Sequence, residues 1–355
     1  MVNRKKLLDS LNMVKPALAV KDYIPILTYF MFDDGSVTAY NDIQAINVES
    51  DVDVQGCIPA ELLIKSLGSM TAEQVEFKRV DNHVLLISGK TKIKLPVLPV
   101  EDYPTVMQHN KKELGTFKIT EEMLTGIKKC LAAASNDPQH PSHMGITLEP
   151  MYSADEIALY STDNVTISCY IVRDKDTLLP DDKPLILPLV FCQQLILLSK
   201  ITMDIEVGIY SGSLVARFED KAVLFTKTLA DVNAINFMDV VSKYINPTQL
   251  TSKLQHIPDV FEQSIDRAVL MQNKEDFKTT SIVIANRTMT LESISKFGEA
   301  TDDMPYAGDD IEINIDPSLV KRVLPIASKM AMFRKVMVLT DENENYIHLI
   351  AYRAS

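Results

Sequence analysis

The chain has 355 residues, a net charge of -12 at neutral pH and a pI near 5.0. Its length predicts two or three domains, and a hydrophobic content of 46% excludes a disordered or low-complexity chain. The acidic balance argues against a nucleic-acid binder coated in positive charge, but it allows one whose positive charge is confined to one surface.

The N-terminal residues and the cysteines indicate the cellular compartment in which the protein works. Residues 1–14 have a basic start but no long apolar region, so we expect no signal peptide, and no apolar run is long enough to span a bilayer. The four cysteines, at 57, 130, 169 and 192, are far apart and show no CxxC spacing. This pattern is typical of buried thiols in a reducing cytoplasm rather than of a disulfide framework or a zinc site.

The first third of the chain begins with a candidate helix at residues 4–18, which presents Leu7, Leu8, Leu11 and Val14 on one face and which Pro16 ends. A second, short helix at 59–70 begins at a proline and has a glycine near its end. Period-two patterns predict strands at 26–32, 36–41, 45–54, 74–80, 83–88 and 90–97.

The same order of elements then recurs twice. The second third has helices at 120–135 and 187–200, and the last third has helices at 258–272 and 316–330. The strands expected between these helices lie at 145–150, 156–162, 165–172, 204–211, 213–220, 222–229, 280–286, 288–297, 335–341 and 346–352.

Three units of roughly 115 residues therefore share one plan. We predict an α+β fold of three repeated domains at 1–115, 116–246 and 247–355, each with two helices packed on antiparallel sheets. Three unrelated α+β segments are the alternative interpretation.

One strand, "KTKIKL" at 90–95, alternates lysines with threonine, isoleucine and leucine, so one face is basic and the other mostly apolar. Prolines at 96, 99 and 104 follow. Because proline cannot donate to a strand ladder, this strand lies at a sheet edge or leaves the sheet. A lysine ladder of this kind is also a common way to protect a solvated edge from aggregation.

An enzyme is the competing class of protein. The best candidate cluster is Asp137, His140 and His143, but Pro138 and Pro141 interrupt the helix that His-x-x-His metal binding would need. The sequence has no GxSxG, P-loop, HExxH or GxGxxG motif. We therefore expect no catalytic residue, no metal and no cofactor; a metal-dependent hydrolase remains the distant alternative.

Several segments in fixed order carry a family resemblance. They are "VKDYIPILTYFMF", "GCIPAELLIKSL" and "LLISGKTKIKLPVLPVEDYP" in the first unit, "MGITLEP" and "LYSTDNVTIS" in the second, and "SIDRAVLMQNKEDF" in the third. In these segments the chain resembles the bacterial-type DNA sliding clamp, the DNA polymerase III beta subunit, over most of its length.

The departures from this family cluster where it binds partners. Asn164 stands where the family has a glycine after its threonine-aspartate pair, "LADVNAINFMDVV" replaces a glycine- and proline-containing run, and "HLIAYRAS" lacks the usual proline. Such divergence would suit a clamp encoded by a phage or another mobile element.

The resemblance implies a replication processivity factor. It implies a head-to-tail homodimeric ring that encircles duplex DNA without reading its sequence and tethers the replicative polymerase. It also implies an ATP-dependent clamp loader as partner, cytoplasmic localisation in a bacterial cell or phage-infected host, no membrane and no catalytic activity. A non-catalytic scaffold on the same fold is the second alternative.

The resemblance also implies where the two chains meet. The strand at 90–95 would continue the sheet of the other chain's third domain, with acids that follow a third-domain strand facing the lysines. The residues expected at this dimer interface are Lys90, Lys92, Ile93, Leu95, Leu270, Met271, Glu299, Asp302 and Asp303.

The helices of a clamp line the hole, so they should be more basic than the rest. The six expected helices, taken at 3–15, 59–70, 120–135, 188–200, 253–271 and 316–330, carry a net charge of +5, which leaves -17 for the remainder. Helices also collect lysine for other reasons. The candidate DNA contacts are Arg4, Lys21, Lys65, Lys128, Lys129, Gln139, His140, Lys200, Lys321, Arg322 and Lys329.

The family binds short partner peptides in an apolar cleft between its second and third domains. A few aliphatic or aromatic anchors usually dominate such binding. By resemblance the cleft would be lined by His143, Met144, Ile167, Asn236, Val240, Val241, Ile350 and Tyr352. The alternative is that the aliphatic members are plain core residues.

Overall fold

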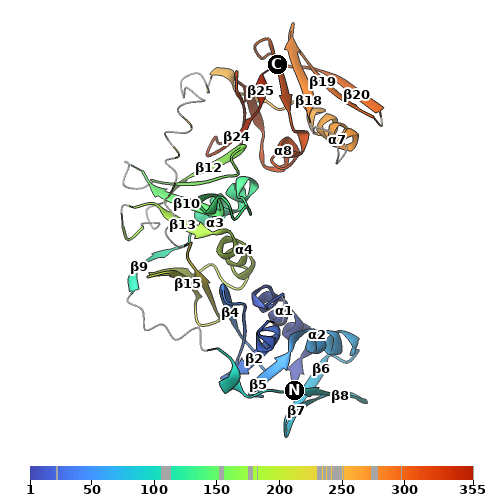
Figure 1. Cartoon of the computed structure of the whole chain (residues 1–355), viewed down its shortest axis with the longest axis vertical. Coiled ribbons are helices and arrows are strands. Elements are labelled where there is room, and N and C mark those ends of the chain that lie inside the picture. Colours follow the sequence, from blue (N-terminus) through green and yellow to red (C-terminus); the bar gives the residue numbers. More distant parts are fainter. Residues whose placement is uncertain are drawn as a thin grey trace. The chain divides into compact units, whose positions relative to one another are not determined.

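The computed structural model folds into a sheet-rich α+β architecture (Figure 1). It describes residues 1–20, 23–104, 113–151, 156–174, 179–181, 183–229, 234, 237, 241, 250, 252–272, 279–296 and 298–354. The chain forms two compact units. Unit 1 comprises Met1–Glu121, Asp176–Asp181 and Val190–Ala230, and unit 2 comprises Glu122–Lys175, Asp182–Leu189 and Asp231–Ser355.

Unit 1 contains two antiparallel sheets. The larger sheet has the order β5-β2-β3-β4-β16-β15-β14-β9, and the smaller has the order β1-β6-β7-β8. Their strands are β1 (Val2–Asn3), β2 (Tyr29–Asp33), β3 (Ser36–Tyr40), β4 (Gln44–Glu49), β5 (Gly56–Pro59), β6 (Gln74–Val80), β7 (His83–Ser88), β8 (Thr91–Pro96), β9 (Glu113–Lys118), β14 (Ile205–Tyr210), β15 (Ser213–Phe218) and β16 (Ala222–Lys227).

Helices α1 (Arg4–Val14) and α2 (Ala60–Ser69) pack on these sheets and on each other. The Asn3 side chain caps α1 by accepting a hydrogen bond from the Lys6 amide. Of the face predicted for α1, Leu7, Leu11 and Val14 are buried, whereas Leu8 is half-buried. Most of the apolar helix α4 (Leu189–Leu198) also belongs to unit 1. These three helices confirm the helices expected in the corresponding stretches.

Unit 2 also has an eight-stranded sheet, in the order β13-β10-β11-β12-β24-β23-β22-β17, and a five-stranded sheet, in the order β20-β19-β18-β21-β25. The strands are β10 (Gly145–Pro150), β11 (Glu156–Thr162), β12 (Thr166–Arg173), β13 (Leu185–Pro188), β17 (Gln255–His256), β18 (Thr280–Ala285), β19 (Thr288–Ser295), β20 (Gly298–Pro305), β21 (Ile311–Ile315), β22 (Lys329–Met332), β23 (Val336–Thr340), β24 (Tyr346–Ala351) and β25 (Arg353–Ala354). Its described helices are α3 (Glu121–Cys130), α7 (Phe261–Met271) and α8 (Pro317–Lys321).

The pairing of β12 with β24 joins distant parts of the sequence in unit 2. Ile167 pairs with Leu349, and Ser168 pairs with His348. Because successive side chains on a strand point to opposite faces, these two pairs lie on opposite sides of the sheet.

The structure corrects three predicted elements. The helix expected at 316–330 ends after α8, because Pro325 cannot continue a helix, and Lys329 begins strand β22. The strand expected at 45–54 ends at Glu49. The acids at 299–303 follow the expected strand β19, and they themselves lie on a further strand, β20, whose sequence lacks the apolar alternation that would have revealed it.

The three-domain division stays a prediction. The boundary at 115 falls within β9, and the boundary at 246 lies outside the described residues. The four cysteines are buried free thiols, as predicted. None of the described helices is long and apolar enough to cross a membrane.

Candidate functional site

The lysine-rich strand β8 is a sheet edge, as predicted, because β7 is the one described strand that pairs with it. At the edge of the five-stranded sheet of unit 2 lies β20, whose ladder among the described strands is with β19. One open edge is therefore basic and the other acidic, although they lie in different units of the chain.

The register shows which charges share a face. Lys92 and Lys94 pair with Ile87 and Leu85, on the face opposite the buried Leu86. On β20, Glu299, Thr301 and Asp303 likewise lie opposite the buried Met304. Each edge therefore presents its alternate charges on the face that points away from its core. Lys94 belongs to this row, although the sequence analysis had not included it among the interface residues.

The apolar residues expected at these edges differ in exposure. Leu95 is buried, with 5% of its surface exposed, whereas Ile93 is half-buried. Near the other edge, on helix α7, Leu270 is 76% exposed and Met271 is half-buried, and on β19 Ile294 is 68% exposed. Leu95 thus belongs to the core of unit 1. Ile294 is an exposed apolar candidate that the sequence analysis missed, since alternation alone did not say which face of its strand is covered.

Asp302 is engaged within its own chain. Arg267 on α7 donates to both carboxylate oxygens of Asp302, from Nε at 2.9 Å and from Nη2 at 2.6 Å. These bonds raise the pKa of Arg267 and hold Asp302 on the helix side of the sheet. Glu299 and Asp303 are the acids of this edge that are exposed and form no ion pair among the described residues.

Most of the predicted DNA contacts are paired within the chain. Arg4 donates to the carbonyl oxygens of Leu67 and Ala72 near the end of α2, at 3.2 and 3.1 Å. The remaining paired side chains are Lys65 with Glu61, Lys129 with Asp341, His140 with Asp137, Lys321 with Asp266, Arg322 with Asp163, and Lys329 with Glu344.

Lys129 is the most enclosed of these cations on a helix. Its Nζ lies 2.5 Å from an Asp341 oxygen, and the two side chains are only 20% and 14% exposed. The same ammonium lies 5.1 Å from the ring centre of Tyr170 and 5.7 Å from that of Tyr346. Lys129 therefore links α3 to the loop before β24, and little of it faces solvent.

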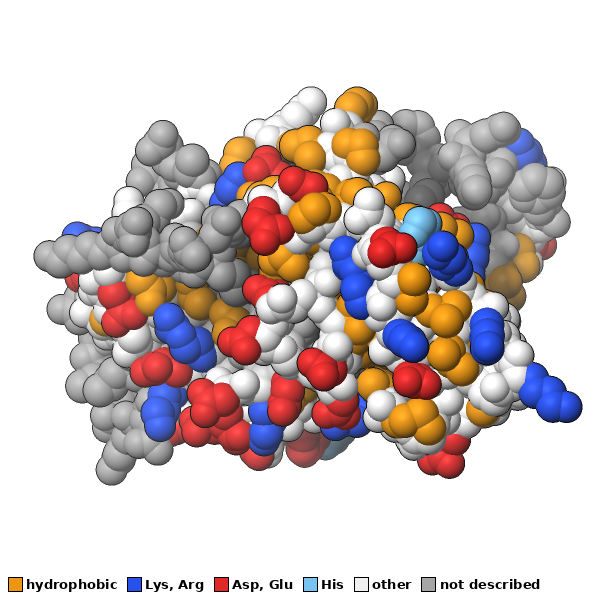
Figure 2. Space-filling model, turned by 90° about the horizontal axis from the view of Figure 1, so that it is seen from below, with side chains coloured by type: hydrophobic (Ala, Val, Ile, Leu, Met, Phe, Trp, Pro, Cys, Tyr) orange, Lys and Arg blue, Asp and Glu red, His pale blue; other side chains and the backbone are white. Residues whose placement is uncertain are grey.

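Lys128 and Lys200 are exposed and form no ion pair with a described residue. Gln139 is also exposed, while Lys21 lies outside the described residues. In the view of Figure 2, basic side chains are more frequent in one half and acidic side chains in the other, with exposed apolar side chains among both. Positive charge is thus unevenly distributed over that face.

An apolar pocket of about 170 Å³ lies in unit 2, above the β12–β24 junction. Strands β11, β12, β23 and β24 supply most of its wall. The lining residues are His143, Tyr160, Thr162, Asn164, Val165, Ile167, Phe237, Val336, Leu349 and Ala351.

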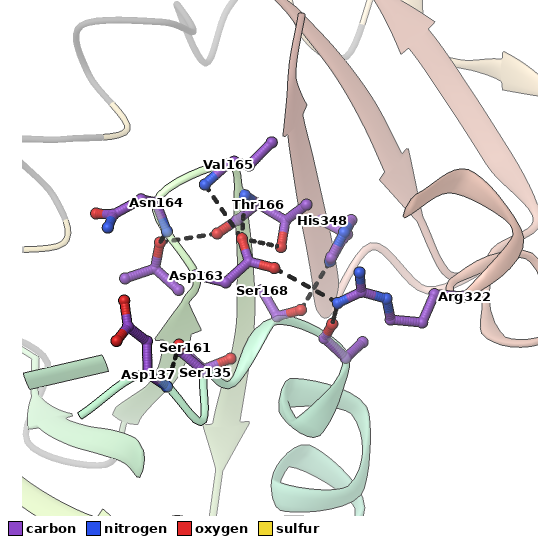
Figure 3. A network of polar contacts seen from close by, with 12 residues as sticks. Ser135, Asp137, Ser161, Asp163, Asn164, Val165, Thr166, Ser168, Arg322 and His348 are labelled. Carbon is purple, nitrogen blue, oxygen red and sulfur yellow. Dashed lines mark hydrogen bonds and ion pairs between the residues drawn. The ribbon is translucent and has the colours of Figure 1, made fainter. Parts of the chain in front are cut away.

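A tight turn from Thr162 to Thr166 forms one rim of this pocket (Figure 3). Oδ1 of Asp163 accepts hydrogen bonds from the amides of Val165 and Thr166, at 3.1 and 2.6 Å, and from the Thr166 hydroxyl at 2.8 Å. Asn164 has a φ of 72°, a left-handed conformation that asparagine tolerates better than most side chains. This tolerance explains how Asn164 can replace the glycine found at this position in the family that the sequence resembles.

His143 is the titratable side chain among the described lining residues that sequence reasoning had placed here. It is 7% exposed, and its ring stacks on His140 with 5.3 Å between ring centres. Burial, with a further contribution from the neighbouring His140, lowers the pKa of His143, so the imidazole is neutral at pH 7. A neutral imidazole suits an apolar pocket.

The other predicted cleft residues differ in where they lie relative to the pocket. Ile167 lines the pocket, Val241 packs beside it, and Met144 is not in the wall. Ile350 is fully buried on the opposite face of β24, and Tyr352, two residues on, is also outside the wall. Asn236 and Val240 lie outside the described residues. The wall residues that were missed, such as Leu349, depend on the β12–β24 register, which the sequence does not reveal.

The reverse face of this junction is polar. The Ser168 hydroxyl lies 2.7 Å from His348 Nδ1 and 3.1 Å from the Tyr346 hydroxyl, and all three side chains are buried. Burial lowers the pKa of His348 to about 3, so it too is neutral at pH 7. These contacts fix the register that brings Ile167 and Leu349 together on the pocket side.

No group of three or more His, Cys, Asp or Glu side chains that could hold a metal ion occurs among the residues described. In the cluster of Asp137, His140 and His143, the candidate for a metal site, His140 pairs with Asp137, and the ring of His143 stacks on that of His140. The geometry therefore offers no support for the metal-dependent alternative.

Comparison with known proteins agrees with this geometry. Residues 1–107 match the family model of the DNA polymerase III beta subunit, N-terminal domain. The chain is 24% identical, over an alignment of 382 positions, to the beta sliding clamp of Streptococcus pneumoniae strain R6, and the alignment covers 98% of this chain and 97% of that protein. The beta sliding clamp of Lactococcus lactis is 25% identical over 202 positions, about half of each chain.

Solved structures share the whole fold. The DNA polymerase III beta subunit of Thermotoga maritima superimposes with a TM-score of 0.82 at 16% identity, covering 100% of this chain and 98% of that one. The beta chain of Streptococcus pneumoniae TIGR4 gives a TM-score of 0.83 at 19% identity, with 100% and 99% covered. The N-terminal 107 residues thus match the family model of the DNA polymerase III beta subunit, and the whole chain shares the fold of the solved beta subunits and is similar along its length to the beta sliding clamps.

Proposed function

We propose that this chain is a DNA sliding clamp, a replication processivity factor that encircles duplex DNA and tethers a polymerase to it. The observation that carries the proposal is the pair of open sheet edges, one basic on β8 and one acidic on β20. An accessory role of this kind requires no catalytic group and no cofactor in the chain itself.

Two copies would close head to tail. In this arrangement β8 of one copy continues the five-stranded sheet of the other through β20, and the second contact closes the ring. Lys92 and Lys94 would then face Glu299 and Asp303 across the new ladder, while Ile93 and Leu270 add apolar contact. Three domains in each chain would give six around the hole.

The apolar pocket of unit 2 would receive a short peptide segment of a polymerase or of another partner. Its volume and its wall of Ile167, Phe237 and Leu349 suit one or two aliphatic or aromatic anchors. An ATP-dependent loader would open the ring, since the chain has no nucleotide-binding motif. The free cysteines suit the cytoplasm of a bacterial or phage-infected cell.

The test is the solution mass, followed by retention on DNA. The chain has a mass of 39.8 kDa, so light scattering should give roughly 80 kDa for two copies across a concentration series. Rings loaded on nicked circular DNA should resist high salt and leave once the DNA is linearised. Equal retention on circular and linear DNA would rule out topological holding and would favour a scaffold that does not encircle DNA.

A further inference from the structure

Arg322 was a candidate DNA contact because of its place on a basic helix, but its guanidinium points toward the pocket rim (Figure 3). Its Nη1 donates to the carbonyl oxygen of Ala132 at 3.0 Å and lies 3.4 Å from Oδ2 of Asp163. All three residues belong to unit 2. One nitrogen of Arg322 thus joins the end of α8 to the segment after α3 and to the rim turn.

Asp163 divides its two oxygens between two tasks. Oδ1 accepts three of the hydrogen bonds that shape the turn containing Asn164 and Val165, and Oδ2 contacts Arg322. Asp163 is only 20% exposed, whereas Arg322 is 44% exposed. Arg322 therefore acts on the pocket rim through a carboxylate whose other oxygen already holds that rim.

We propose that Asp163 and Arg322 are positioning residues of the pocket, with Asp163 shaping the rim turn and Arg322 fixing the orientation of Asp163. The proposal builds on the peptide-binding role proposed above for the pocket. It assigns Arg322 to partner binding rather than to DNA, and it makes the affinity for an apolar peptide depend on two charged side chains outside the pocket wall.

Asp163 and Arg322 should contribute unequally to the shape of the pocket rim. Without the Asp163 carboxylate, two backbone amides and one hydroxyl lose their acceptor, and the left-handed Asn164 loses the bonds that hold it. Without Arg322, the 20%-exposed carboxylate of Asp163 and the carbonyl of Ala132 each lose one partner, and the 3.4 Å contact to the carboxylate is the weaker of the two. The effect of Asp163 should therefore be the larger.

The experiment compares Asp163→Ala, Asp163→Asn, Arg322→Met and Arg322→Lys in the full chain. Arg173→Met is the matched control, because Arg173 lies on the neighbouring strand β12 and pairs with Glu156 and Asn345 away from the pocket. The first readout is hydrogen exchange of residues 161–167. The second is the affinity for a panel of fluorescein-labelled pentapeptides that contain leucine and phenylalanine.

Asp163→Ala should speed exchange of the rim amides and weaken peptide binding, each by about tenfold. Arg322→Met should change the exchange rate and the peptide affinity by about two- to fivefold. Arg322→Lys should fall between wild type and Arg322→Met, and Asp163→Asn between wild type and Asp163→Ala. Arg173→Met should match wild type in both readouts. A role confined to stability would lower the melting temperature without changing either readout at 25 °C.

The proposal is overturned if Arg322→Met cannot be distinguished from Arg173→Met in exchange and in peptide affinity. It is also overturned if Arg322→Met instead lowers DNA affinity with the rim unchanged. The exchange readout decides the positioning role even if the wild type binds none of the peptides, an outcome that would count against the proposed use of the pocket.

Discussion

The lysines of β8 and the cations of the helices were predicted to serve two different partners, and the structure treats them differently. Lys92 and Lys94 are exposed on an open edge and form no ion pair with a described residue. The helix cations Lys65, Lys129 and Lys321 each have a carboxylate partner within the chain. Positive charge on the edge is thus free for a partner molecule, while much of that on the helices is already neutralised.

This difference shows why counting charges along a sequence is a weak guide to a binding surface. A net charge of +5 on the expected helices includes side chains that face acids from other elements. An exposed pair such as Lys321 with Asp266 contributes little to stability, but its carboxylate offsets the positive charge that a phosphate would otherwise meet. Lys128 and Lys200, which form no ion pair with a described residue, should therefore contribute more to DNA binding than the other helix cations.

The largest expected effect comes from reversing the charges of the edge strand. Lys92→Glu combined with Lys94→Glu should weaken self-association by about 100-fold, because like charges would face each other across the ladder. Light scattering across a concentration series measures this change.

The control for this reversal is Lys78→Glu, on the inner strand β6, which should leave the mass unchanged. Adding Glu299→Lys and Asp303→Lys to the reversed edge should restore the dimer. If the four-residue swap stays monomeric, β20 is not the partner of β8.

The next largest effect concerns the enclosed helix cation. Lys129→Met should lower the free energy of unfolding by about 2 kcal/mol, since it leaves the 14%-exposed Asp341 without its cation. Lys65→Met, which removes a solvated pair, should leave the free energy of unfolding unchanged within the error of the measurement. Urea unfolding at pH 7 compares the two, and equal effects would mean that enclosure does not matter here.

The smallest effect concerns the salt dependence of DNA binding, which should differ between helix cations that have a carboxylate partner and those that do not. Lys128→Met and Lys200→Met should each reduce the slope of log affinity against log salt by about 1 if each lysine contacts one phosphate. Lys65→Met should change that slope less, because its ammonium already bonds Glu61. Fluorescence anisotropy with a short duplex measures the slopes, and a larger change for Lys65 would reverse the ranking.

Much of the fold could be predicted from local pattern. Apolar spacing identified most of the core faces of α1 and α2, although Leu62 of α2 is 49% exposed. The lysine alternation followed by prolines identified β8 as an edge. Strand β20 could not be found in this way, since its apolar content is too low for the period to show. Pro325 signals that the helix beginning at α8 must end, but the helix predicted at 316–330 from apolar spacing did not take this proline into account.

The sequence by itself determined the class of fold, the family resemblance and the chemistry of one sheet edge, because these depend on short-range periodicity and on motif order. Only the tertiary structure decided which cations are free, which face of β24 lines the pocket and what Arg322 contacts. Each of these depends on strand register and on pairs of residues more than a hundred positions apart, such as Asp163 with Arg322 and Lys129 with Asp341. A one-residue shift of register would exchange Leu349 for Ile350 in the pocket wall, and no local pattern excludes it.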